Sequence, residues 1–148
     1  MALHLQKLCV GAESIDSQRD WQAGPGRIYA RSRGYDTPCH TTRMMPKRAD
    51  ELLDGGSLYW IIKGLVRLRQ RIIAVNRVKG DDGISRCDLV FDPELVAVVP
   101  RAHRPFQGWR YLNAQDAPRD LDGFSEEGEG FAHFPADLQL QLSELGLL

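Results

Sequence analysis

Three arginines alternate with other residues along one segment of the chain and could bind phosphate. Arg67, Arg69 and Arg71 occupy every second position, so in a β-strand their side chains would lie on one face. Each guanidinium can donate two parallel hydrogen bonds to anionic oxygens. Such a row could equally be a solvated sheet face whose charges are partly paired with acids of a neighbouring strand. The pattern therefore predicts a phosphate site, and a solvated sheet face without a ligand is the alternative.

A second group of cations surrounds the expected start of a helix. Pro46 suits the first helical position, because its fixed φ is helical and its missing N–H would be unpaired there. Arg43, Lys47 and Arg48 flank it. A helix N-terminus carries partial positive charge and free N–H groups, so cations placed there favour an anionic ligand. The alternative is surface charge offset by the acids at 50, 51 and 54.

Aromatic side chains interleaved with arginines form a third group. The segment 106–111 (FQGWRY) would place Trp109 and Tyr111 on one face of a strand, with Arg104 and Arg110 close by. Single-stranded nucleic acids are bound by this combination, because aromatic rings stack on bases while cations meet phosphates. The two rings could instead pack under the loop at 100–105.

A smaller aromatic pair precedes the arginine row. Tyr59 and Trp60 would point to opposite faces of a strand over 57–63, so one should be buried and the other could stack on a base. We expect Trp60 in the core, because large aromatics dominate core burial. Tyr59 and Lys63 then join the candidate binding residues.

The histidines and cysteines form no metal-binding or catalytic pattern. His40 and His103 could transfer protons, but neither has a second ligand at a metal-binding spacing. Nucleophile-elbow, P-loop and dinucleotide motifs are also missing from the sequence. We therefore predict no metal and no cofactor, and assign no catalytic residue. Cys9, Cys39 and Cys87 are odd in number and far apart, which predicts reduced thiols and a cytoplasmic protein.

The net charge of −1 conceals a strong segregation of charge. Residues 41–79 carry nine Lys or Arg against three acids, and residues 101–119 carry four against one. Residues 120–148 carry seven acids and no Lys or Arg. This asymmetry predicts an anionic partner for the middle of the chain, an acidic tail that shields it, or both. No apolar run approaches the ~20 residues of a membrane span, so no membrane partner is predicted.

These side chains need secondary structure to position them. The segment 65–78 has a helical stripe, but its β-branched residues and the Gly-Asp-Asp-Gly turn that follows favour a strand. Periodicity and breakers predict the rest. Strands are expected at 2–10, 39–44, 57–63, 65–78, 84–91, 95–99 and 106–112, helices at 15–23 (capped by Ser14), 27–33, 47–53 and 135–147, and a basic loop at 100–105.

This order of elements predicts an α+β fold with a small, mainly antiparallel curved sheet. The length of 148 residues fits one domain with a continuous core. We assign residues 1–121 to a single α+β domain. Residues 122–148 would form an acidic linker and a C-terminal amphipathic helix packed on or near that domain.

Several segments together resemble an uncharacterised alphaproteobacterial family, the domain of unknown function family 1489. They are LHLQKLCVGAESI, TRMMPKRADELLDGGSLYWIIKG, RQRI, DPELV and RPFQGWRYLNAQDAPRDL, all between residues 1 and 121. The resemblance implies a bacterial, cytoplasmic protein and no established activity.

A looser resemblance concerns architecture. The pattern Pro-x-x-Ala-x-x-Leu-x-Asp-Gly-Gly from Pro46, followed by a strand, is similar to the helix-then-strand start of the PUA and ASCH superfamily. It implies a PUA-like β-barrel with flanking helices, a fold that often binds RNA or modified bases in the cleft beside that helix. Arg43, Lys47 and Arg48 would then lie near the cleft, with Tyr59 or Trp60.

The leading hypothesis is a non-enzymatic binding module for RNA or a nucleotide-like anion. Its first alternative is an enzyme acting on a small anionic or nucleotide substrate, with His40 or His103 transferring protons and Arg43 or Arg104 holding the anion. The second alternative is a protein-interaction module regulated by the acidic C-terminal segment.

Overall fold

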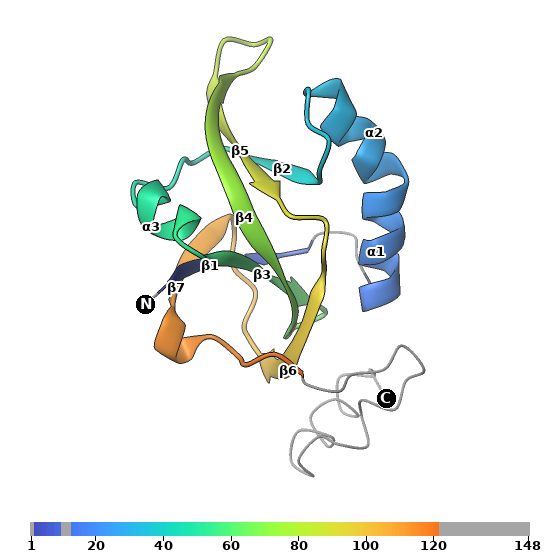
Figure 1. Cartoon of the computed structure of the whole chain (residues 1–148), viewed down its shortest axis with the longest axis vertical. Helices are drawn as coiled ribbons and strands as arrows, with labels where there is room; N and C mark the ends of the chain where they lie inside the picture. The colour runs from blue at the N-terminus through green and yellow to red at the C-terminus, as the bar shows by residue number, and fades with distance from the viewer. Residues whose placement is uncertain (1, 10–12, 122–148) are drawn as a thin grey trace.

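A computed structural model describes residues 2–9 and 13–121, and shows one seven-stranded sheet flanked by three α-helices (Figure 1). The acidic linker and the helix expected at 135–147 lie outside the described residues. The elements are β1 (Leu3–Leu8), α1 (Ile15–Ala23), α2 (Pro25–Ser32), β2 (Cys39–Thr42), α3 (Ala49–Leu53), β3 (Ser57–Ile62), β4 (Leu65–Lys79), β5 (Ser85–Phe91), β6 (Val96–Ala102), β7 (Trp109–Asn113) and a short 3-10 turn (Ala114–Asp116).

The sheet is organised around the long strand β4. Its path is β2-β5-β4-β3-β1-β7, and β6 pairs with β4 beside this path. Strands β5 and β6 follow one another along the same edge of β4, while β3 pairs with the other edge. Only β1 and β3 run parallel among the paired strands of the described part. The predicted α+β fold with a mainly antiparallel sheet is confirmed, and β2 and β7 remain unpaired with each other, so the described sheet is open.

Both faces of the central strands are covered, which explains the apolar run in β3. Leu58, Trp60 and Ile62 pack into a larger core cluster, and Tyr59 and Ile61 into a smaller one on the opposite face. Tyr59 is 4% exposed and Trp60 is 3% exposed. The expectation that one of these two rings would reach the surface is therefore wrong, because His40 of β2 and Phe91 of β5 pack against Trp60 and the 106–117 segment packs in the cluster of Tyr59.

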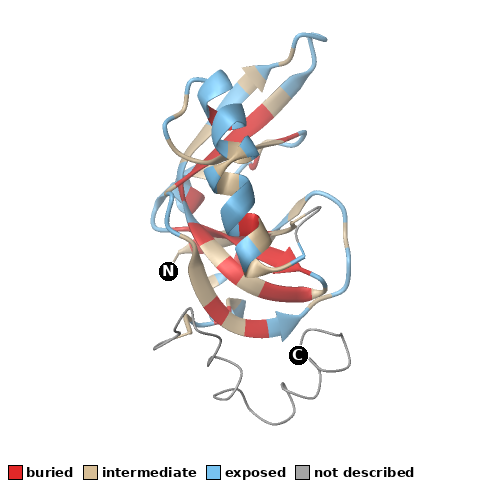
Figure 2. Cartoon of the chain, turned by 90° about the vertical axis from the view of Figure 1, so that its right-hand side faces the viewer, coloured by how far each residue is buried: buried red, intermediate tan, exposed pale blue. Residues whose placement is uncertain are grey.

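Helices α1 and α2 form a column along one side of the sheet (Figure 1). Ser14 caps α1 as predicted, since its side chain accepts a hydrogen bond from the Ser17 N–H. Gly24 ends α1 and begins α2, so the Gly-Pro-Gly break becomes a joint between two helices. The outward face of the column is exposed, while the strands behind it are buried (Figure 2).

The helix predicted at 47–53 is shorter than expected. Helix α3 begins at Ala49 with Arg48 as its N-cap, so the buried Pro46 lies outside the helix. Contacts with β7 explain the difference: Met44 O accepts a hydrogen bond from Trp109 Nε1 at 2.7 Å, and Arg48 N–H donates to Tyr111 Oη at 3.1 Å. These bonds hold residues 44–48 in a turn against the sheet. The predicted helix start at Pro46 is therefore wrong, and no helix N-terminus lies at that residue.

Strand β6 also extends further than predicted, through Pro100 to Ala102. A proline lacks the N–H that a strand ladder needs, so it is tolerated at a bulge. The β4–β6 register shifts between Val66, which pairs with Arg101, and Leu68, which pairs with Ala97. Pro100 falls within that irregular stretch, which explains why the strand continues through it.

Gly56 allows β3 to start close to two other backbones. A Cβ there would overlap the carbonyl oxygens of Leu3 and Leu52, whereas at Gly55 (φ +87°) it would meet open space. We predict that Gly56→Ala lowers the free energy of unfolding by about 3 kcal/mol, because backbone atoms must move. Gly55→Ala should cost only about 1 kcal/mol of left-handed strain. Urea denaturation followed by tryptophan fluorescence measures both, and equal losses would contradict this packing.

Candidate anion-binding site

A buried carboxylate joins α2, β2 and β5. Asp88 lies in β5 and is 1% exposed. Its Oδ2 accepts hydrogen bonds from Arg33 Nε and Tyr35 Oη, both at 2.8 Å, and its Oδ1 accepts one from Thr41 Oγ1 at 2.8 Å. A buried charge is tolerated when its lone pairs are satisfied in this way. The carboxylate therefore fixes side chains from three separate elements in one place.

The donors to Asp88 keep their protons. The hydrogen bond to Asp88 raises the pKa of Arg33, so its guanidinium stays charged. Burial raises the pKa of Tyr35, so the phenol stays neutral and donates. Thr41 is the register partner of Asp88 across the β2–β5 ladder, and its hydroxyl also contacts Tyr29 Oη. The cluster is a charge-assisted network with fixed donor directions.

A cavity of about 440 Å³ opens beside this network. We call it the arginine hollow. It lies between α2, β2 and the hairpin that joins β4 to β5. Three guanidiniums (Arg33, Arg43 and Arg86) and three hydroxyls (Tyr29, Thr41 and Thr42) line it, together with Val78 and Gly80.

Two of the three guanidiniums that line the hollow are paired with acids of the described residues, and the third is not. Arg33 uses Nε for Asp88, which leaves Nη1 and Nη2 without an acceptor among the described residues. Arg86 pairs with the exposed Asp82, at 3.0 and 2.8 Å, and this hydrogen bonding lowers the pKa of Asp82 to about 2. Arg43 is exposed, and no acid of the described part pairs with it. Guanidinium donors around one cavity are suited to a tetrahedral oxyanion.

Of the predicted binding residues, Arg43 is the one that lines the hollow. The structure brings together two other predicted groups at β7. Arg48 lies over the Tyr111 ring at 5.5 Å, and Trp109 meets Tyr111 edge to face at 4.9 Å. Arg48 is also paired with Glu51 at 2.5 Å, while Lys47 is exposed. This β7 surface consists of partly exposed aromatics with cations beside them.

The three arginines of the predicted row lie in different environments. Arg69 donates from Nε and Nη2 to Asp120, at 2.6 and 2.7 Å, and from Nη1 to Ser57. Arg67 lies at the irregular stretch of β4, and burial lowers its pKa. Arg71 is exposed. Pairing with an acid of a neighbouring segment is the structural alternative that the sequence left open, and at Arg69 it holds.

The remaining predicted residues lie apart from the hollow. Lys63 is exposed in the β3–β4 turn with φ +49°. Arg110 packs over the Phe106 ring at 4.9 Å, and Arg104 is exposed in the β6–β7 loop. The ring of Tyr59 is buried against His4, so it has no free face for stacking.

The two candidate histidines occupy different environments. His40 packs edge to face on Trp60 at 5.9 Å, and burial lowers its pKa to about 4. His103 lies with Arg101 and Tyr111 in a separate cavity of about 340 Å³. Neither borders the arginine hollow. Within residues 2–9 and 13–121, no group of three His, Cys, Asp or Glu side chains could hold a metal ion, and no helix could cross a bilayer.

Sequence reasoning missed most of the hollow. Arg33, Arg86 and Asp88 drew no attention, because they are isolated charges in a helix and a strand. The available signal was Asp88 itself. It lies between Cys87 and Leu89 in an apolar strand, so its carboxylate must either be buried or interrupt the alternation of buried and exposed side chains. Its partners lie 47 to 55 residues away in the chain, and only the fold identifies them.

Fold and site together define an α+β protein with a basic surface hollow. A family model described as protein of unknown function (DUF1489) matches residues 5–148. The chain belongs to this family, which confirms the resemblance of the segments quoted above. Comparison with curated proteins and with solved structures gave no match.

Asp88 should be essential for the geometry of the hollow. We predict that Asp88→Asn lowers the free energy of unfolding by about 3 kcal/mol, because it leaves Arg33 as a charge without its partner. Asp82→Asn is the matched control: its pair with Arg86 is exposed to solvent, so we expect a much smaller loss of stability. Chemical denaturation at pH 7 measures both. Similar small losses would show that Asp88 does not organise this region.

His40 should make the fold sensitive to acid. Its pKa is about 4 in the folded protein, against 6.5 for an ordinary histidine, because burial disfavours the imidazolium. The unfolded chain therefore binds a proton first, and stability falls as pH drops from about 6.5 to about 4. His40→Gln should flatten the stability profile in this window, as measured by urea denaturation at several pH values. An unchanged slope would contradict this assignment.

Proposed function

We propose that the protein is a non-enzymatic binding module that holds phosphate groups of RNA or of a nucleotide-like anion in the arginine hollow. The observation that carries the proposal is the gathering of Arg33, Arg43 and Arg86 around one cavity with three hydroxyls. A planar guanidinium matches the geometry of phosphate oxygens. Thr42 adds a neutral hydroxyl at the same place, whereas the hydroxyl protons of Thr41 and Tyr29 are used in their bonds to Asp88 and to Thr41.

Preorganisation supports this function. Arg33 is held by Asp88, and Thr41 by the same carboxylate, so neither must be ordered when the ligand arrives. Arg86 is similarly held by Asp82. Arg43 is the mobile donor, because it has no ion-pair partner in the described part of the chain. Its charge should then contribute most directly to binding.

RNA is favoured over an isolated phosphate by the continuity of the basic surface. The segment from Arg43 to Arg48 leads from the hollow to the β7 surface, where Arg48, Trp109 and Tyr111 meet. A single strand crossing this segment would place phosphates near Arg43 and Lys47. Its bases would reach the partly exposed Trp109 and Tyr111 rings.

The same proposal includes a PUA-like fold and a bacterial cytoplasmic setting. The turn at Pro46, helix α3 and strand β3 follow one another as in a PUA-like domain. Residues 119–121 hydrogen-bond to Ala97 and Val99 of β6 and so add an extended segment beside that strand. The three cysteines are free thiols, in keeping with a reducing bacterial cytoplasm. These features support RNA binding by analogy of fold.

A direct test is titration of a fluorescently labelled 12-nucleotide single-stranded RNA at 50 and 200 mM salt. Neutralised phosphates release counterions, so we predict at least a tenfold loss of affinity at the higher salt. Arg43→Gln should weaken binding about fivefold at low salt and reduce the salt dependence. Arg119→Gln removes an equal charge from the distant edge of β6 and should have little effect.

Absence of binding at 50 mM salt would refute the proposal. Equal losses for Arg43→Gln and Arg119→Gln would show non-specific attraction rather than a site. Competition by millimolar inorganic phosphate that is lost in Arg43→Gln would localise the interaction to the hollow.

A further inference from the structure

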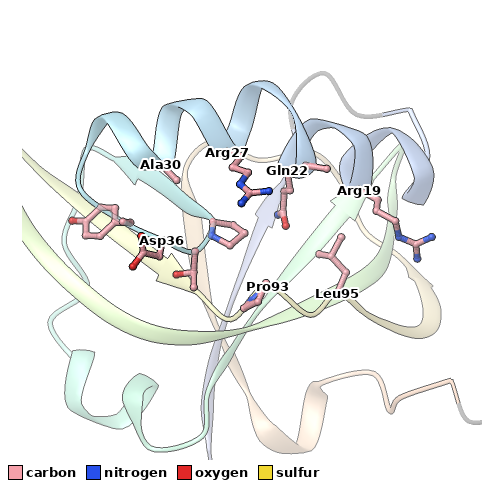
Figure 3. A pocket seen from close by; sticks show the side chains of 11 residues that line it. Arg19, Gln22, Arg27, Ala30, Asp36, Pro93 and Leu95 are labelled. Carbon is pink, nitrogen blue, oxygen red and sulfur yellow. The ribbon is translucent and has the colours of Figure 1, made fainter.

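A second cavity, of about 370 Å³, lies beneath the α1–α2 column (Figure 3). We call it the helix slot. The two helices form its roof, and the loops at 35–38 and 93–95 form its floor. Its volume is within the range of small-molecule sites. It is separate from the arginine hollow, with which it shares no lining residue.

The amide of Gln22 lines the slot in a fixed orientation. Gln70 is fully buried; its Oε1 accepts from Trp60 Nε1 at 3.1 Å, and its Nε2 donates to Asp92 O at 3.0 Å. Gln22 must therefore present Nε2 to Gln70 Oε1 and Oε1 to Gln70 Nε2, both at 2.8 Å. This chain of bonds assigns the amide without ambiguity between its oxygen and nitrogen.

Gln22 keeps hydrogen-bonding capacity after this pairing. A primary amide has two N–H donors and two oxygen lone pairs, and the pair with Gln70 uses one of each. Figure 3 shows Gln22 and Arg27 directed from the helices into the slot. The slot therefore offers an oriented donor and acceptor beside a guanidinium.

The two walls of the slot suit a flat ligand. Small side chains, Ala23 and Ala30, lie on the helix side, and two proline rings, Pro38 and Pro93, lie on the side of the loops with Leu95. Rigid, flat and apolar walls of this kind suit a planar ring, which loses little conformational freedom on binding. An aliphatic chain would leave the remaining N–H and lone pair of Gln22 without a partner from the ligand.

The charge at the slot favours an anion. Arg27 has no ion pair among the described residues, and Arg19 stands at the α1 end of the slot. The one acid that lines the slot is the exposed Asp36, beside Tyr35 (Figure 3). Arg19 is also paired with Asp16 at 3.7 Å, so Arg27 is the guanidinium of the slot that an anionic ligand would bind.

We propose that the helix slot binds a small planar heteroaromatic anion. The ring would lie between the helix alanines and the prolines, with a ring N–H or carbonyl on the Gln22 amide. The acidic group would lie on Arg27. A heteroaromatic carboxylate and a nucleoside monophosphate share this chemistry, and the experiment separates them. The inference does not depend on the arginine hollow.

The experiment is isothermal titration of the full chain with orotate, a pyrimidine carboxylate, and with UMP. Uracil lacks the charge and benzoate lacks the polar ring edge, so both serve as matched ligands. We expect orotate or UMP to bind at least tenfold more tightly than uracil or benzoate. Preference for orotate would assign a carboxylate attached to the ring, and preference for UMP a phosphate at a distance from it.

Three variants locate the ligand. Arg27→Gln should weaken the anions about tenfold and leave uracil unchanged. Gln22→Met should weaken orotate about fivefold while sparing benzoate. Ala23→Phe fills the slot without touching the glutamine pair, so it keeps the test valid if Gln22→Met unfolds the chain. Thermal melting of each variant checks the fold.

Arg43→Gln is the control, because it changes the arginine hollow and not the slot. Unchanged orotate affinity in Arg43→Gln, together with unchanged RNA affinity in Arg27→Gln, would show two independent sites. The inference is overturned if neither orotate nor UMP binds at 5 mM, or if Ala23→Phe and Arg27→Gln bind as tightly as the natural sequence.

Discussion

The buried carboxylate of Asp88 is the interaction on which the candidate site depends. It accepts hydrogen bonds from Arg33, Tyr35 and Thr41, which come from the end of α2, the following loop and β2. Together with the contact between the Tyr29 and Thr41 hydroxyls, these bonds hold the end of the helix column to the sheet. A buried ion pair is seldom a large net source of stability, because desolvation opposes attraction. Its main consequence here is geometric: one carboxylate fixes a guanidinium and a hydroxyl at the wall of the arginine hollow.

A second buried polar network holds the middle of the helix column, next to the joint between α1 and α2. Gln70 joins Gln22 of α1, Trp60 of β3 and the carbonyl of Asp92, which lies in the break between β5 and β6. Both networks satisfy side chains that would otherwise be costly to bury. A cavity lies beside each network: the arginine hollow beside Asp88, and the helix slot beside the Gln22–Gln70 pair. The polar groups that hold the helix column to the sheet therefore also orient hydrogen-bond donors toward these two cavities.

Local chemistry predicted most elements of the fold and little of the site. The Ser14 cap, the Gly-Asp-Asp-Gly turn and the β-branched residues of 65–78 are local signals, and the matching helix and strands are present. Tertiary contacts decided the exceptions: Trp109 and Tyr111 hold residues 44–48 in a turn, so α3 starts late. Charge density drew attention to Arg67–Arg71, where Asp120 neutralises Arg69. The hollow combines single arginines from distant segments, which no local pattern reveals.

The central claim is that Arg33, Arg43 and Arg86 form one phosphate site. The most direct measurement is NMR of the arginine Nε–Hε groups during titration of the natural protein with a 12-nucleotide RNA and, separately, with inorganic phosphate. The account predicts saturable shifts of these three guanidiniums with both ligands, while Arg69, held by Asp120, stays unchanged. Shifts confined to Arg104 and Arg110, or no saturable shift at Arg33, Arg43 and Arg86, would contradict it.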